Sequence, residues 1–459
     1  MRQPPSQEEQ PQKRRKAPSR DRCWSLPSEL PDGWEAAELE PAAPTTDSCF
    51  AALFHGDSDE YFVYACVLGR SLRSTSSGPD RVLLCGPGRC REAGIRKALR
   101  AAGWDRLLPV CAIPAAHLDR TKAKRHALVF TKLRVLELPY RRVLLLDLDL
   151  LPRETLSAGE CEGGLAQLLR LPAPAAKYQC AAGAQPEGLR HGETIPPYVQ
   201  EGYRWSPNAG VIRLDPLPGL QERQAQVAAM VEEVAQRQQA SYLPEQYYLA
   251  ERLSGWRHMD KDWNWEVWPE WDDPGFTHPV QYACQRARSA GWAGYYGNNL
   301  ECPRPDTVLK EVKVWHFSGR WETAPWMFQD SADTDAVRAS AVALFRFRDP
   351  GAVVATAVVE WRRALEQALM AEGAEISSFG GDDLELGPLR LASDRLAQRA
   401  TQRRQQYWWC DSCEEPRARV RCLEDVPLGG KCCSVDSRGL KWVCVECIVR
   451  RLRAASHTE

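Results

Sequence analysis

Runs of apolar residues alternate with amphipathic stretches from residue 47 onward, and this alternation predicts strands and helices in turn. Strands are expected at CFAALFH (49–55), DRVLLCGP (80–87), DRLLPVCAI (105–113) and RRVLLLDLDLLP (141–152). Apolar residues at helical spacing fall between them, at 61–75, 90–103 and 128–138. Strand–helix alternation of this length indicates an α/β fold with a mostly parallel sheet covered on both faces, whose inner strands are almost entirely apolar.

Composition divides the chain into four predicted parts. Residues 1–46 are rich in Pro, Gln and charge and are expected to form a disordered basic tail, whose KRRK (13–16) is either a solvated segment or a nuclear address. The α/β domain is expected to span 47–335. Residues 336–405, rich in Ala, Arg and Glu, predict a helical extension or linker, and 406–453 a small cysteine-rich module.

Two carboxylates interrupt the most apolar of the expected strands, because Asp147 and Asp149 directly follow residues 143–146. An unpaired buried carboxylate is very costly, and open α/β sheets bind ligands at the carboxyl ends of their strands. Side chains two apart on an extended chain share a face, so both could reach one cation. Oxygen ligands suit Mg²⁺ or Mn²⁺, and an added imidazole favours Mn²⁺. Two solvated aspartates at a strand end are the alternative.

Five segments, in the same order along the chain, resemble glycosyltransferase family 8, the glycogenin type. They are ALFHGDSDEYFVYACVLGRSLRST (52–75), FTKLRVLELPYRRVLLLDLDLLP (130–152), SPNAGVIRL (206–214), PEQYYLAERL (244–253) and VKVWHFSGRWETAPW (312–326). The resemblance covers about residues 47 to 330. It implies a GT-A fold, which is Rossmann-like with a mostly parallel sheet, and a retaining glycosyltransferase. Such an enzyme transfers a hexose from a UDP-sugar to a glycan, protein or polyol acceptor.

The resemblance also implies a role for each matching residue. Asp147, Asp149 and His316 would hold Mn²⁺ (or Mg²⁺), which bridges the donor diphosphate and neutralises the leaving UDP. Donor contacts would come from Tyr61, stacked on uracil, and from Lys132, Asp147, Asn208, Gly210, Gly319 and Arg320. The catalytic pair facing the anomeric carbon would be Glu245 and Gln246. Structural alternatives are an exposed helical Lys for Lys132, a plain turn at 208–210 and a first helical turn at 244–246.

Departures from the family pattern concern the catalytic and phosphate-binding positions. Glu245 stands where the family usually has Asp, and Ala209 replaces a Ser. Ala324 replaces the Lys before Pro-Trp that grips the diphosphate, and Arg320 is the expected substitute, because a guanidinium can hold phosphate with two hydrogen bonds. Retention of configuration would use either a carboxylate nucleophile, for which Glu245 is the candidate, or a front-face route without one.

Tryptophans are dense between residues 256 and 271. Trp256, Trp263, Trp265, Trp268 and Trp271 could form a stacking wall for a carbohydrate acceptor, but packing in the interior is the favoured interpretation, because Trp buries a large area. Within this stretch, residues 262–264 (DWN) resemble an aromatic–Asn pair of the family.

Seven of the 17 cysteines crowd into residues 410–447. Two C-x-x-C pairs, Cys410 with Cys413 and Cys444 with Cys447, have the spacing of a tetrahedral Zn²⁺ site. A second site could draw on Cys422, Cys432, Cys433 and His457. The module weakly resembles PHD- or CW-type fingers, which implies a protein partner; a structural Zn²⁺ that only stabilises a small domain is the alternative. The ten earlier cysteines are expected to be reduced thiols.

Net charge and hydropathy limit the ligands, the location and the function that the chain can be expected to have. Lys+Arg 60 against Asp+Glu 61 leaves a net charge of −1, which offers no global field for nucleic acid or an anionic membrane. No apolar run predicts a membrane span or a signal peptide, so we expect a cytoplasmic protein, with a nuclear location as the alternative. Two functions follow: a Mn²⁺-dependent, UDP-sugar-using glycosyltransferase, or a zinc-finger adaptor whose transferase domain has lost activity. The change at Ala324 favours the second, and the intact metal and donor residues favour the first.

Overall fold

The computed structural model describes most of residues 44–267 and several later segments. The described ranges are 33–34, 44–75, 78–115, 118, 128–154, 164–180, 190–195, 205–237, 244–267, 309–318, 324–327, 351–377 and 387–410, with the short stretches 415–416, 419–421, 433–435 and 441–444. No helix within these ranges is both long and apolar enough to span a membrane.

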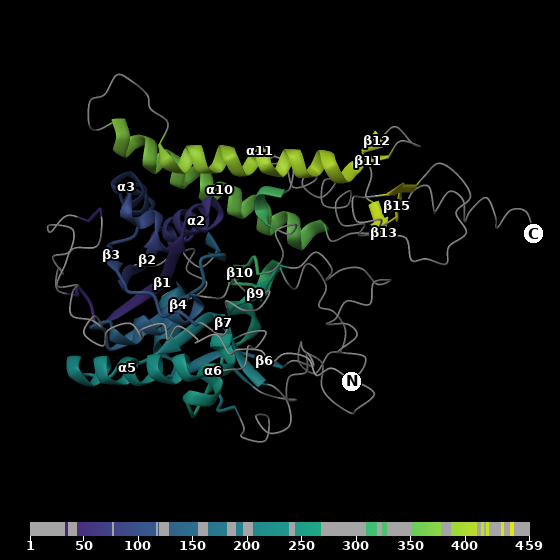
Figure 1. Cartoon of the computed structure of the whole chain (residues 1–459). Coiled ribbons are helices and arrows are strands. Elements are labelled where there is room, and N and C mark those ends of the chain that lie inside the picture. Colours follow the sequence, from purple (N-terminus) through teal and green to yellow (C-terminus); the bar gives the residue numbers. More distant parts are fainter. Residues whose placement is uncertain are drawn as a thin grey trace, which may run out of the picture.

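A seven-stranded sheet forms the centre of the molecule (Figure 1). Its strands are β1 (Ser48–Gly56), β2 (Asp80–Gly88), β3 (Arg106–Pro109), β4 (Arg142–Leu146), β6 (Ala175–Cys180), β7 (Trp205–Leu214) and β8 (Arg257–His258), in the order β3-β2-β1-β4-β7-β6-β8. The pairs β2–β3, β1–β2, β1–β4 and β6–β8 are parallel, whereas β7 runs antiparallel to β4 and β6. The predicted α/β class with a mostly parallel sheet is confirmed.

Helices cover both faces of this sheet. The face with α2 (Asp59–Thr75) and α3 (Ala93–Ala102) lies opposite the face with η4 (Val129–Glu137), α5 (Leu220–Gln236) and α6 (Pro244–Arg252). Side chains of β1 alternate between the two hydrophobic clusters, with Phe50 and Phe54 in one and Ala51 and Leu53 in the other. This period of two within an entirely buried strand explains why the sequence reads as a continuous apolar run.

Three of the expected elements differ in the structure. The helix expected at 128–138 is the 3₁₀ helix η4, in a segment where β-branched Val129, Thr131 and Val135 disfavour the α form. The strand expected at 105–113 is only β3, which ends at Pro109, a residue without a backbone N–H to continue the ladder. The strand expected at 141–152 is interrupted after Leu146 and continues as β5 (Leu150–Pro152) in another sheet.

A small second sheet forms beyond this interruption. β10 (Val314–His316) pairs antiparallel with β5 and parallel with β9 (Trp265–Glu266). His316 thereby lies opposite Leu150, and Val314 opposite Pro152. Segments far apart in the sequence are thus joined immediately after β4.

Two long helices, α10 (Gly351–Ser377) and α11 (Pro388–Trp408), lie over α2 and α3 (Figure 1). Buried Val354, Val358 and Trp361 of α10 and Leu389 and Leu396 of α11 belong to the same hydrophobic cluster as the sheet. Arg395 and Arg399 of α11 also pair with Asp59 in the first turn of α2, each at 2.7 Å. The part of the predicted extension that the structure describes therefore packs as a further layer of the domain.

The short C-terminal strands contain three of the predicted Zn²⁺ ligands. β11 (Trp409–Cys410) pairs with β12 (Glu415–Pro416), and β15 (Lys441–Cys444) lies between β13 (Arg419–Arg421) and β14 (Cys433–Val435). In the ladder Cys433 pairs with Val443, one residue from Cys444. Cys413, Cys422, Cys432, Cys447 and His457 lie outside the described residues, so the Zn²⁺ site remains a prediction.

Glu360 of α10 connects that helix to both strands of the β5–β10 pair. Its carboxylate accepts hydrogen bonds from Arg153 Nε at 3.0 Å and Nη2 at 2.8 Å, and from Trp315 Nε1 at 2.7 Å. Arg153, which directly follows β5, also donates to the carbonyl of Val312 at 3.1 Å and stacks over the Trp315 ring. One carboxylate therefore joins α10, β5 and β10.

We predict that Glu360→Gln lowers the free energy of unfolding by about 1–3 kcal/mol, because the nearly buried Arg153 loses its counter-charge and one strong acceptor. Urea denaturation followed by circular dichroism measures this. Glu366→Gln, on an exposed position of the same helix, removes the same charge and should change stability by less than about 0.5 kcal/mol. Equal effects of the two substitutions would show that the contacts of Glu360 with Arg153 and Trp315 do not stabilise the fold.

A second prediction concerns His258 of β8, whose side chain is only 2% exposed. Burial, aided by His191 and Lys177, lowers the pKa of His258 to about 4. The unfolded chain, with a pKa near ~6.5, then binds the proton more tightly, so stability falls as pH drops from ~6.5 toward ~4. Between about pH 7 and pH 5 the wild type should lose about 2 kcal/mol more stability than His258→Gln. Identical losses in paired urea titrations would contradict this.

Candidate metal and donor site

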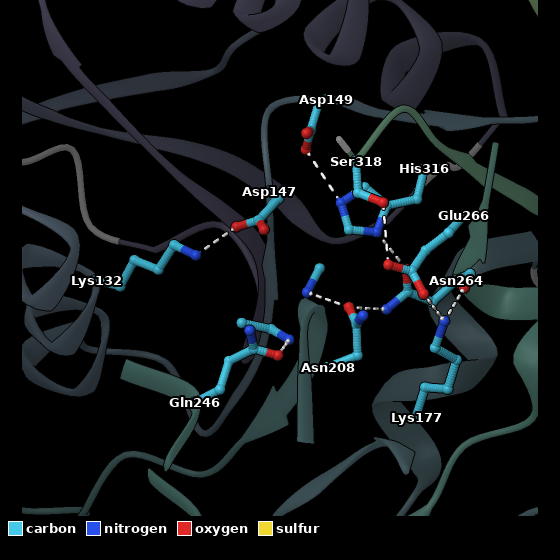
Figure 2. Close-up of polar contacts among 12 residues, drawn as sticks. Lys132, Asp147, Asp149, Lys177, Asn208, Gln246, Asn264, Glu266, His316 and Ser318 are labelled. Atoms are coloured by element: carbon cyan, nitrogen blue, oxygen red, sulfur yellow. Dashed lines mark hydrogen bonds and ion pairs between the residues drawn. The ribbon is translucent and has the colours of Figure 1, made fainter. Parts of the chain in front are cut away.

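The interruption after β4 places two carboxylates and an imidazole together at the carboxyl end of the central strands. Asp147 N donates to Gly210 O of β7 at 2.9 Å, and Phe317 N donates to Asp149 O at 2.8 Å. Metal-ligating atoms of Asp147, Asp149 and His316 all lie within 4.8 Å of one another (Figure 2). The predicted convergence of the two aspartates is confirmed, although a turn produces it and not a shared strand face.

This donor set fits a hard divalent cation. Two carboxylates and one imidazole are the oxygen-rich, nitrogen-containing combination that suits Mn²⁺ or Mg²⁺. In the structure the Asp149 carboxylate lies 3.3 Å from His316 Nε2. Burial would raise the pKa of Asp149, but His316, together with Lys132 and a backbone hydrogen bond, outweighs burial and holds that pKa below its usual range. Positive charge at this position is therefore what the pocket favours.

Lys132 supplies a fixed cation beside the cluster. Its Nζ lies 2.6 Å from Asp147 Oδ1 and 3.2 Å from Glu245 Oε1. Burial alone would lower the pKa of Lys132, but Asp147 and Glu245 outweigh it and raise that pKa. Asp147 keeps a raised pKa because burial dominates over Lys132. The alternative of an ordinary exposed lysine at position 132 is thereby excluded.

Asn264 orients the imidazole from behind. Asn208 Oδ1 accepts hydrogen bonds from Gly210 N at 2.9 Å and from Asn264 Nδ2 at 2.7 Å. The side-chain oxygen Oδ1 of Asn264 is then left to accept a hydrogen bond from His316 Nδ1 at 2.7 Å, so this nitrogen carries the proton. Nε2 is the atom presented to Asp149 and to any cation. A second partner of this kind is typical of histidines that bind metals.

Gly210 is needed for this arrangement. A Cβ at this position would lie 2.6 Å from His316 Cε1 and 2.9 Å from Asn264 Oδ1. Any larger residue would push the imidazole ring out of place. The family resemblance implies that Gly210 lies against the donor. In the structure, the groups that lie against Gly210 are the side chains of His316 and Asn264.

A buried ion pair lies under Asn264 and was not predicted from the sequence. Lys177 Nζ donates to Asn264 O and pairs with Glu266 Oε2, both at 2.9 Å, while Ser318 Oγ donates to Glu266 Oε1 at 3.0 Å. Burial would raise the pKa of Glu266, but Lys177, His316 and Ser318 together outweigh burial and lower that pKa to about 2. Single charges within apolar runs, at AAKYQC (175–180) and WNWEVW (263–268), are the signal that could have revealed both residues.

The predicted catalytic pair lies on α6, which begins at Pro244 as its first-turn chemistry suggests. Gln246 Oε1 accepts a hydrogen bond from Ala209 N at 2.9 Å, which orients the amide. Among the described residues its Nε2 has no acceptor, so it remains available to a ligand. Glu245 is buried, and its Oε2 has no hydrogen-bond partner within the same ranges.

Tyr61 has an exposed ring, whereas the tryptophans that the structure describes between residues 256 and 267 have buried side chains. Tyr61, at the start of α2, is 40% exposed, and its ring lies 6.0 Å from that of His55 at the end of β1. Trp256, Trp263 and Trp265 are buried, which confirms interior packing for these three. Trp268 and Trp271 lie outside the described residues, as do Gly319 and Arg320. Ala324 is described, and it is buried at 5% exposure.

Solved structures similar to this chain are glycosyltransferases. Galactosyltransferase LgtC, in complex with donor and acceptor sugar analogs, is 15% identical over 69% of this chain and 99% of its own, with a TM-score of 0.37. Mouse xyloside xylosyltransferase 1 is 16% identical over 61% and 99%, with a TM-score of 0.33. Glycosyltransferase GlyE of Streptococcus pneumoniae is 14% identical over 72% and 63%, with a TM-score of 0.37. No family model and no curated protein match the chain. At these scores the function has to be inferred from the residues of the site.

We predict that Asn264→Ala weakens the binding of Mn²⁺ by about 10–100-fold, because His316 loses the partner that fixes its ring and tautomer. Isothermal titration with MnCl₂ measures the affinity directly. Gln221→Ala, on an exposed position of α5, is the control and should bind like the wild type. An unchanged affinity in a folded Asn264→Ala protein would mean that His316 is not a ligand.

Proposed function

We propose that this protein is a retaining glycosyltransferase that transfers a hexose from a UDP-sugar and depends on Mn²⁺. The observation that carries the proposal is the convergence of Asp147, Asp149 and His316, with ligand atoms within 4.8 Å, at the carboxyl end of β4. When bound there, Mn²⁺ would act as a Lewis acid that neutralises charge on the departing diphosphate. The ordered motifs of glycosyltransferase family 8 in the sequence supply the donor class.

The protein side chains around the cluster fit a nucleotide-sugar. Tyr61 offers an exposed aromatic ring beyond the end of β1 on which uracil would stack. Lys132 holds positive charge at Asp147, where it would meet the donor phosphates. Gln246 Nε2 and Asn208 would face the donor sugar. Each of these groups is held by neighbours before any donor arrives, which lowers the entropic cost of orienting it.

Glu245 determines how retention would work. As a nucleophile its carboxylate would attack the anomeric carbon, and a covalent sugar ester would then be opened by the acceptor. The Lys132 ammonium group lies 3.2 Å from this carboxylate. In a front-face route Glu245 would instead only hold Lys132 in place, and both routes retain configuration.

The missing Lys before Pro-Trp favours a second candidate function. Ala324 is buried and uncharged, so the phosphate-binding cation would have to come from elsewhere, and we propose Arg320. Without such a cation, the domain would have little transferase activity. The chain would then act as an adaptor through a Zn²⁺ module built on Cys410, Cys413, Cys444 and Cys447. Detection of Zn²⁺ in the purified protein is compatible with both functions and does not decide between them.

We predict that UDP with Mn²⁺ raises the thermal unfolding midpoint by several degrees, whereas either alone has little effect, because the cation links the diphosphate to the carboxylates. Asp149→Asn should abolish this shift while leaving the fold intact. Asp394→Asn, on an exposed position of α11, should retain it.

A panel of UDP-sugars, assayed for hydrolysis and by mass spectrometry of the protein itself, then identifies the donor and any self-glycosylation. If Asp149→Asn keeps the full Mn²⁺-dependent shift, the metal assignment is wrong. If the wild type binds UDP but uses no UDP-sugar, the adaptor function is the better one.

A further inference from the structure

A second concentration of unbalanced charge lies at the opposite end of the central strands. An open cavity of about 1000 Å³ is bordered by the segments that lead into β4 and out of β7. Five arginines and two aspartates line it, together with apolar residues that include Leu169, Leu171 and Leu217. The arginines are Arg141, Arg142, Arg170, Arg213 and Arg223, and the aspartates are Asp47 and Asp215.

The two buried arginines form part of the wall and keep donor capacity. Arg213 is 2% exposed and Arg223 is 7% exposed. Arg213 donates from Nε to Leu169 O at 3.1 Å and pairs through Nη1 with Asp215 at 2.6 Å. Arg223 donates from Nε to Glu137 O at 3.2 Å and from Nη1 to Leu217 O at 3.0 Å. Within the described ranges neither Nη2 has an acceptor.

The other three arginines have no carboxylate paired with them among the residues that the structure describes. No carboxylate or carbonyl of the described chain accepts a hydrogen bond from the side chains of Arg141, Arg142 or Arg170, and Asp215 is already paired with Arg213. Burial lowers the pKa of Arg213 despite Asp215, and the positive charge of Arg142 lowers it further. Guanidinium groups therefore outnumber the lining carboxylates by three, and they repel one another until an anion enters.

We propose that this cavity is a binding site for a small organic phosphate. A phosphate group accepts paired hydrogen bonds from guanidinium forks, and it would satisfy the free donors of Arg142 and Arg213 together. The leucine side chains and Tyr140 provide apolar surface for the body of the molecule. The site is distinct from the donor site: Arg142 begins β4 and Asp147 follows its other end, about 16 Å away along the strand.

The test measures phenyl phosphate and inorganic phosphate by isothermal titration in EDTA, so that no divalent cation takes part. Phenyl phosphate should bind at least about tenfold more tightly than inorganic phosphate, because the apolar wall contributes. The double variant Arg142→Gln/Arg170→Gln should weaken phenyl phosphate binding by about tenfold or more, as expected for lost charge-assisted hydrogen bonds. Asp149→Asn should bind it like the wild type.

Arg73→Gln/Arg100→Gln, at two exposed arginines on α2 and α3, is the control with a matched loss of charge and should bind phenyl phosphate normally. The proposal is overturned if the wild type shows no binding at about 10 mM phenyl phosphate. It is also overturned if Arg73→Gln/Arg100→Gln weakens binding as much as the Arg142→Gln/Arg170→Gln variant, which would indicate attraction by overall charge. Equal unfolding midpoints of the Arg142→Gln/Arg170→Gln variant and the wild type verify that both are folded.

Discussion

The antiparallel pairing of β5 with β10 is the constraint on which the site depends. It places His316 opposite Leu150, next to Asp149, although His316 is far from both in the sequence. The pair is held from outside by Glu360, through Arg153 and Trp315, and from inside by Asn264. Because α10 provides Glu360, the geometry of the site depends on this C-terminal helix. The position of Tyr61 in turn depends on α11. Asp59, two residues before Tyr61 in α2, pairs with Arg395 and Arg399 of that helix.

Several buried charges of the described residues, away from the two ends of the central strands, have a partner of opposite charge. Glu266 has Lys177, Arg134 has Glu137, and Arg153 has Glu360. A buried charge without a partner is too costly to keep for stability alone. At the carboxyl end, carboxylates and an imidazole gather with Lys132 as their only lysine or arginine partner among the described residues. At the other end, guanidinium groups exceed carboxylates. The excess of acidic groups at the carboxyl end therefore indicates a cation as ligand, and the excess of guanidinium groups at the other end indicates an anion.

The sequence was sufficient for the features that depend on local pattern. The buried strands, α2 and α3 follow from apolar spacing, and the carboxylates at the end of β4 follow from the rule that open sheets bind ligands there. What it could not predict depends on contacts between distant segments. The chain turns after Leu146, and residues 150–152 pair with β10 and not with β7, a choice that no local signal encodes. Lys177 and Glu266 each stand out as a single charge in an apolar run, but their pairing with each other follows only from the folded structure.

The apolar character of β4 accounts for the location of both charged clusters. Residues 143–146 are buried on both sides of the sheet, so neither face can hold a hydrated ion. Charged residues can lie only where the strand emerges, and the chain has arginine at one end and aspartate at the other. In neighbouring β7, Arg213 lies near the end of the strand, and Asn208 and Gly210 lie just before Val211, where the pairing with β4 begins. Because both strands are stiff and buried between the two ends, a ligand at either end could change the other only by shifting these strands as a unit, and close packing on both faces resists such a shift.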